Sequence, residues 1–191
     1  AGRLSHRDQF RFDHEKGVDL CVEAWARRAP AGATLLLAGK GPTEAALRRQ
    51  VDDLAERRSS IRFLPPTRDV RRLLAAADVF VLPSCSEGIS NALLEAMAAG
   101  IPALATAVGG NQEVLSSPAV GRLSPRDPDA FGTSLAELLG DRGAARALGE
   151  AGRAHVARHF SVATVVDAYE ALYAELVAGA RRRSSSPSLP R

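Results

Sequence analysis

The chain has 191 residues, of which 46% are hydrophobic and 25% charged, a composition typical of one globular domain with a buried core. No apolar run reaches the roughly 18 residues needed to span a membrane, and no signal-peptide pattern opens the sequence. The net charge of +3 comes from arginines scattered along the chain rather than gathered into a patch, which argues against nucleic-acid binding.

Strands and helices alternate through the first two thirds of the sequence. Ala1 to Ser5 read as the end of a strand and its turn, so we expect the sequence to begin inside a larger protein. Helices are predicted at 15–29, 43–58 and 70–76, and strands at 33–38, 61–64 and 79–82, with further alternating units through residue 123. This alternation predicts an α/β fold with a Rossmann-like, doubly wound parallel sheet, in which ligands gather at the carboxyl ends of the strands.

The last third of the sequence is helical in pattern. Helices are predicted at 127–139, 141–158 and 162–178, and the last of them carries apolar residues that need something to pack against. We assign residues 1–178 to one domain and residues 179–191, rich in arginine and serine, to a disordered basic tail.

Residues 78–110 carry the strongest indication of a ligand site. The apolar run that ends at Leu82 and is closed by Pro83 predicts a strand covered on both faces. Gly88 then allows a tight turn, and a helix begins near Ser90 or Asn91 with its unpaired N–H groups facing back toward the end of the strand. An anion would bind there.

Two carboxylates flank this turn. Glu87 precedes the helix, and Glu95 lies inside it among apolar neighbours, where an unpartnered buried charge would cost several kcal/mol or more. Taken alone, Glu95 could be a structural residue bonded to nearby backbone and Glu87 a solvated turn residue.

The segment EGISNALLEAMAAGIPALAT resembles the signature of the family 4 retaining glycosyltransferases, in which two glutamates are separated by seven intervening residues. The segments AGRLS, HEKGVDL, LLLAGKGP, LLAAADVFVLPS, VGGNQEVL and LGEAGRAHV resemble the family's pattern in the same order. The resemblance extends to about residue 178 and implies one half of a glycosyltransferase-B fold, the donor-binding half, with an N-terminal acceptor-binding domain as its missing partner. The family usually keeps the segments AGRLS and HEKGVDL much closer together, so we expect residues 6–13 to be an insertion.

The resemblance also implies a set of site residues. Arg3 and Lys16 would hold the diphosphate of a nucleotide sugar, Glu87 would accept hydrogen bonds from the donor sugar, and Glu95 would accept them from the ribose. Arg3, Lys16 and Glu87 are the implied catalytic residues. The implied donor-binding residues are Gly2, Glu87, Gly88, Ser90, Asn91, Ala92, Leu93 and Glu95. Neither a metal nor a cofactor is expected, and Ser90, where the family most often has proline, is expected to cap the helix.

Several alternatives remain open at this level. His155 and His159 have the spacing of metal ligands on a helix, but the sequence offers no third ligand. The chain could also be a nucleotide-sugar binding module or a subunit of a split transferase, or a basic interaction protein whose site has decayed. Cys21 and Cys85 lie in dissimilar contexts and indicate free thiols in a cytoplasmic protein. The positive charge leaves peripheral contact with the inner face of a membrane open.

Overall fold

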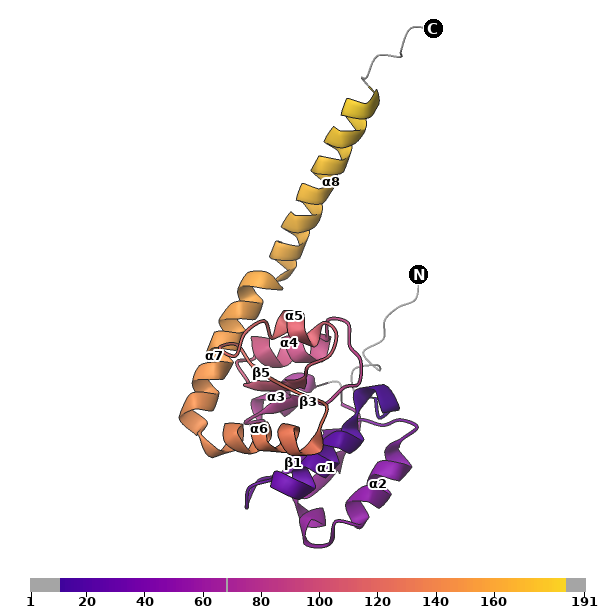
Figure 1. Ribbon diagram of the computed structural model, residues 1–191, viewed down its shortest axis with the longest axis vertical. Coiled ribbons are helices and arrows are strands. Elements are labelled where there is room, and N and C mark those ends of the chain that lie inside the picture. The colour runs from indigo at the N-terminus through magenta and orange to yellow at the C-terminus, as the bar shows by residue number, and fades with distance from the viewer. Residues whose placement is uncertain (1–10, 68, 185–191) are drawn as a thin grey trace.

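The computed structural model describes residues 11–67 and 69–184 (Figure 1). The strand expected within residues 1–5 lies outside these ranges. The described strands form two parallel ladders, one of two strands and one of three. The first pairs β1 (Leu35–Ala38) with β2 (Ile61–Leu64), and the second has the order β3 (Phe80–Leu82), β4 (Ala103–Thr106) and β5 (Arg122–Ser124). The α/β class with parallel strands is confirmed, with the described strands in two ladders instead of one.

The strands of the second ladder are covered on both faces, as the sequence predicts for the run before Pro83. In β3, Phe80 and Leu82 pack into one hydrophobic core, whereas Val79 and Val81 face the other. This alternation follows from the two-residue period of a strand. A strand buried on both faces reads as a continuous apolar run, and for this reason the sequence shows it clearly.

Helices surround the ladders on both sides. They are α1 (Val18–Arg28), α2 (Glu44–Asp52), α3 (Val70–Ala75), α4 (Asn91–Ala98), α5 (Asn111–Val114), α6 (Pro128–Gly140), α7 (Arg142–His159) and α8 (Val162–Ser184). Helix α1 packs along α6, and α4 packs along α7. The core between α1, α2 and α6 contains Trp25 and Phe131, and the core under α4 contains Leu93 and Met97.

Two helices differ from their predicted bounds in the first half of the chain. The helix expected from residue 15 is preceded by a 3-10 turn, His14–Lys16, and Gly17 in the left-handed region separates the turn from α1. The helix expected over 43–58 ends at Asp52, because two aspartates oppose the helix dipole at its carboxyl end. A 3-10 segment, Ala55–Ser60, follows it, and Trp25 Nε1 donates a hydrogen bond of 2.9 Å to Ser60 Oγ there.

Helix α8 is longer than predicted and leads away from the rest of the molecule (Figure 1). It continues to Ser184, so residues 179–184, which we expected in a disordered tail, are helical. This stretch contains three arginines and one alanine, which are strong helix formers. Residues 185–191 lie outside the described part of the chain. Large apolar side chains are exposed along α8: Val162, Val165, Val166, Tyr169, Leu172, Tyr173, Leu176 and Val177. Within the described ranges, none of the helices is long and apolar enough to cross a membrane.

Candidate functional site

The site is formed where chain segments meet at the carboxyl ends of the strands. The loop after β3 contacts the 3-10 turn, since Cys85 N donates to Glu15 O at 2.7 Å. The loop after β4 reaches the same place, because Gly110 N donates to Glu87 O at 3.0 Å. The structure therefore brings the neighbourhood of Lys16, Glu87 and Gly109 together.

Glycines allow these segments to approach each other. Gly17 has φ +58°, and a Cβ placed on it would lie 2.1 Å from Pro83 O. Gly109 has φ +44°, and its Cβ would lie 2.0 Å from Glu87 O. A side chain would be strained at both positions and would displace the turn that carries Glu87.

The segment before Lys16 joins the first ladder to the site. Phe12 N donates to Lys40 O at 3.0 Å, and Phe12 O accepts from Thr43 N at 3.1 Å. The Phe12 side chain is only 3% exposed and meets Phe63 edge to face. Phe12 falls within the stretch 6–13 that we expected to be an insertion, and its ring is part of the hydrophobic core because burial of an aromatic side chain is strongly favourable.

Lys16 and Glu87 form an ion pair at the centre of the site. Lys16 Nζ donates to Glu87 Oε1 at 2.7 Å, and the side chains are 29% and 9% exposed. Ser84 Oγ donates to the same oxygen at 2.7 Å. Hydrogen bonds to a charged group at this length are strong. Two residues that are 71 positions apart, and that the resemblance places on different parts of a donor, thus touch each other directly.

The amino end of α4 lies next to Glu87 in the chain. Ser90 caps the helix as expected, since its Oγ accepts from Leu93 N at 3.5 Å. The first N–H groups of a helix have no partner within it, so those of Asn91 and Ala92 are available to an anion. Leu93 is fully buried and anchors this end of the helix. Gly88 is exposed, and nothing lies within 4 Å of the position that a Cβ would occupy on it.

The other predicted site residues are Glu95, which lies on α4, and Gly2 and Arg3. Glu95 is half-buried on α4, whose buried face is formed by Leu93, Ala96 and Met97. Helix α4 is thus less deeply buried than its composition suggests. Arg3 and Gly2 lie outside the described residues, so their predicted place beside Lys16 stays a prediction.

Sequence reasoning missed Ser84, Thr106 and Asn111, which are all fully buried. Ser84 and Thr106 lie at or just after the end of a buried strand, where a small apolar residue would otherwise be expected, and Asn111 is the first residue of α5. That pattern is a usable signal, because buried polar side chains must find hydrogen-bond partners.

His155 and His159 lie side by side on α7, with ring centroids 4.8 Å apart. No group of three histidine, cysteine, aspartate or glutamate side chains in the described ranges could hold a metal ion. Burial lowers the pKa of His155, and the nearby charges of His159 and Arg158 lower it further, although a hydrogen bond with the Val114 backbone acts in the opposite direction. Its Nε2 is buried and has no partner among the described residues.

The lowered pKa of His155 makes stability depend on pH. The unfolded chain, with the ordinary histidine pKa of 6.5, binds a proton more readily than the folded chain, so the free energy of unfolding falls as the pH drops below that value. We expect His155→Gln to reduce this loss, measured as thermal unfolding midpoints from about pH 7 to about pH 5. An equal pH dependence in both proteins would contradict this expectation.

The two cysteines differ in their surroundings. Cys21 is fully buried in α1, and burial raises the pKa of its thiol to about 12. Cys85 is exposed, and its Sγ donates to His14 O at 3.0 Å. Because the thiolate is the reactive form, we expect a thiol reagent to modify Cys85 quickly and Cys21 only after unfolding. The folded Cys85→Ser variant should therefore show no fast reaction with the reagent. Rapid modification of Cys21 in that folded variant would refute the expected difference in reactivity.

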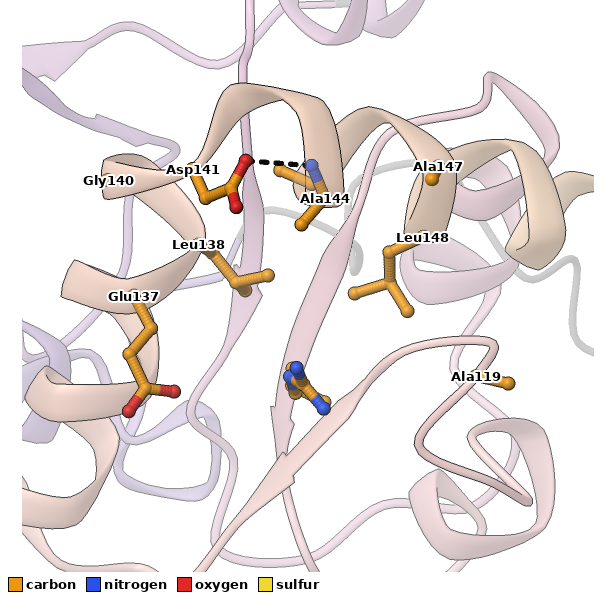
Figure 2. Close-up of a pocket in the computed structure, with 10 residues that line it drawn as sticks. Ala119, Glu137, Leu138, Gly140, Asp141, Ala144, Ala147 and Leu148 are labelled. Carbon is orange, nitrogen blue, oxygen red and sulfur yellow. Dashed lines mark hydrogen bonds between the residues drawn. The ribbon is translucent and has the colours of Figure 1, made fainter.

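A separate hollow of about 510 Å³ lies at the other end of the strands. It is bounded by the amino end of β5, the end of α6 and the start of α7, where Asp141 accepts a hydrogen bond of 2.9 Å from Ala144 N (Figure 2). It is lined mostly by small apolar residues, together with Arg122, Glu137 and Asp141. Since it lies away from the Lys16–Glu87 pair, we do not assign the ligand site to it.

The parallel α/β architecture, with its site at the carboxyl ends of the strands, is that of a Rossmann-like half of a glycosyltransferase-B enzyme. The family model described as "Glycosyl transferases group 1" matches residues 9–141. The chain belongs to this family, which confirms the resemblance seen in its motifs.

Known proteins agree with this membership. The chain is 35% identical over 158 residues to the GDP-mannose-dependent monoacylated alpha-(1-6)-phosphatidylinositol monomannoside mannosyltransferase of Corynebacterium glutamicum, covering 76% of this chain and 40% of that protein. Alr3699/HepE of Anabaena, solved with UDP, has a TM-score of 0.79 at 23% identity, covering 86% of this chain and 47% of the other. The C-terminal domain of a group 1 glycosyl transferase (LpcC) of Francisella tularensis has a TM-score of 0.71 at 20% identity, covering 80% of this chain and 83% of that domain. The chain thus spans about half the length of the full-length relatives it matches.

Proposed function

We propose that this chain is the donor-binding half of a retaining glycosyltransferase, which moves a hexosyl unit from a nucleoside-diphosphate sugar to an acceptor hydroxyl. The observation that carries the proposal is the Lys16–Glu87 ion pair, placed beside the amino end of α4 at the carboxyl ends of the strands. A cation, a carboxylate and free helix N–H groups in one place suit a ligand with both phosphate and hydroxyl groups.

The leaving group accounts for the cationic side of the site. When the bond between the sugar and the diphosphate breaks, negative charge accumulates on the phosphate oxygens. Lys16 and the N–H groups of Asn91 and Ala92 would stabilise this charge, with Arg3 as a further cation, and one well-placed donor contributes about 3 kcal/mol in comparable sites. These residues supply the stabilisation without a metal or another cofactor.

The carboxylates account for recognition of hydroxyl groups. Glu87 would accept hydrogen bonds from the donor sugar, and Glu95 from the ribose. This arrangement differs from a glycosidase, in which two carboxyl groups flank the bond that is cut. The departing phosphate would then take the proton of the acceptor hydroxyl on the same face of the sugar, which accounts for retention of configuration.

The acceptor site belongs in this proposal to a second, N-terminal domain. The chain spans about half of its full-length relatives, and the Francisella tularensis structure, of which this chain covers 83%, is named a C-terminal domain. The exposed apolar residues of α8, among them Tyr169, Leu172 and Leu176, suit a face that packs on such a domain.

A second candidate function is a nucleotide-sugar binding module within a split transferase. The Lys16–Glu87 pair and the helix N–H groups would also serve binding without transfer. Sugar transfer separates the two candidates.

The test is a transfer assay with the chain joined to, or mixed with, the N-terminal domain of a related transferase. The donor would be a nucleotide sugar that the chain is found to bind, and the product's anomeric configuration would be read by proton NMR. Transfer with retained configuration supports the proposal. Binding without transfer favours the binding module, and transfer with inversion contradicts the proposed mechanism.

A further inference from the structure

Three fully buried polar side chains form a connected series behind Glu87. Ser84 follows β3, Thr106 ends β4, and Asn111 begins α5. A polar group removed from water costs free energy unless it is hydrogen-bonded. We call these three residues the buried polar series.

The hydrogen bonds of the series run in one direction, toward the carboxylate. Asn111 Nδ2 donates to Thr106 O at 3.1 Å, Thr106 Oγ1 donates to Ser84 O at 2.6 Å, and Ser84 Oγ donates to Glu87 Oε1 at 2.7 Å. The carboxylate then accepts from Lys16 Nζ on the same oxygen. Glu87 is therefore held from inside the protein by Ser84 and from the other side by Lys16.

Ending the strands does not by itself require a hydrogen bond from a buried serine to the Glu87 side chain. The Ser84 hydroxyl has one proton and gives it to a side chain that we place in the donor site, not to a nearby carbonyl. The Thr106 hydroxyl in turn holds the main chain of Ser84, three residues before Glu87. Because both donors to Glu87 meet Oε1, the second oxygen, Oε2, is the one that a sugar hydroxyl would meet.

We infer that Ser84 and Thr106 are positioning residues, which orient the Glu87 carboxylate and, through it, the Lys16 ammonium toward a nucleoside-diphosphate sugar. The identity of the ligand in this inference rests on the proposed function, whereas the orientation of the ion pair by Ser84 and Thr106 does not depend on it. Ser84 sets the rotation of the carboxylate, Thr106 sets the place of Ser84, and Asn111 fixes the carbonyl end of Thr106.

The first experiment needs no ligand. Lys16 and Lys40 are the only lysines in the sequence, so reductive methylation with isotope-labelled formaldehyde gives two lysine signals in an NMR spectrum. We expect Ser84→Ala and Thr106→Val to move the Lys16 signal and leave that of Lys40 in place. Thr106→Ser keeps the hydroxyl and should restore the original Lys16 signal.

A matched control is available on the neighbouring strand. Ser124 is also a buried serine, paired in register with Thr106, but its Oγ donates to Pro125 O and not to Glu87. Ser124→Ala should leave the Lys16 signal unmoved. The inference would be overturned if Ser84→Ala left the Lys16 signal in place, or if Ser124→Ala moved that signal as strongly as Ser84→Ala does.

The second experiment uses UDP-glucose and GDP-mannose as probes of the donor site. For a probe that binds, Ser84→Ala should weaken binding about tenfold, the value of one hydrogen bond to a charged group. In a Glu87→Gln background, Ser84→Ala should cause no further loss, because its effect acts through Glu87. Full additivity of the two losses would contradict the positioning role. If the unmodified chain binds neither probe, the proposed function fails for these two donors, whereas the NMR result still decides whether the series orients the ion pair.

Discussion

Replacing Gly17 with alanine should lower the thermal unfolding midpoint by roughly 6–16 °C. Gly17 combines a left-handed φ of +58° with a Cβ position 2.1 Å from Pro83 O. The left-handed conformation costs an alanine about 1–2 kcal/mol, and the contact with a main-chain oxygen adds about 2 kcal/mol, for a total of about 3–4 kcal/mol. The displaced loop carries Ser84 and Glu87, so ligand binding should weaken as well.

Gly32 provides the matched control for this substitution. It has an even larger φ of +81°, but nothing lies within 4 Å of the position of its Cβ. Gly32→Ala should therefore cost only the conformational strain, about 1–2 kcal/mol. Equal shifts of the unfolding midpoint in the two variants would show that the close approach of Gly17 to Pro83 is unimportant.

Replacing Lys16 with alanine should weaken binding of the nucleotide sugar about 100-fold, or about 2.7 kcal/mol. The substitution removes a cation from the proposed phosphate site and leaves the Glu87 carboxylate, which is 9% exposed, without its partner. An unpaired carboxylate next to a diphosphate also repels it. Binding constants from isothermal titration calorimetry measure this loss directly.

Two further variants separate these contributions. Lys16→Arg keeps the charge and should retain more affinity than Lys16→Ala, although a guanidinium does not reproduce the geometry of an ammonium ion. Arg48→Ala is the control that also removes a cation, since Arg48 pairs with Glu44 and lies over the Phe63 ring. If Lys16→Ala binds as tightly as the unmodified chain, Lys16 does not contact the ligand.

The sequence was most informative where a local rule determines the structure. The apolar run of β3 and the cap at Ser90 each depend on neighbouring residues, and both were predicted correctly. Gly88, in contrast, has no positive φ and nothing within 4 Å of its Cβ position, so the turn there does not require a glycine. The long helices were also predicted from the sequence, but the positions of their ends were not predicted correctly. Helix α2 is shorter than predicted and α8 is longer, because end positions depend on small differences in free energy among adjacent residues.

Contacts between distant residues could not be predicted in this way. Nothing local indicates that Lys16 meets Glu87, or that Ser84 and Thr106 are joined behind them. The family resemblance placed Lys16 and Glu87 in one site, but their direct contact depends on how the glycine turns bring the loops together. The burial of Phe12 was missed for the same reason, because its partners Lys40 and Phe63 come later in the chain.

The central claim is that this chain binds a nucleoside-diphosphate sugar at the Lys16–Glu87 site. The most direct test is its thermal unfolding midpoint with UDP, GDP, ADP, dTDP and their common sugars, together with the Lys16→Ala and Glu95→Gln variants. A nucleotide at about 100 times its dissociation constant should add about 2.7 kcal/mol of stability to the unmodified chain. We predict such a shift with one nucleotide and its sugar, and a much smaller shift in both variants. No shift with any nucleotide, or an equal shift in the variants, would contradict the claim.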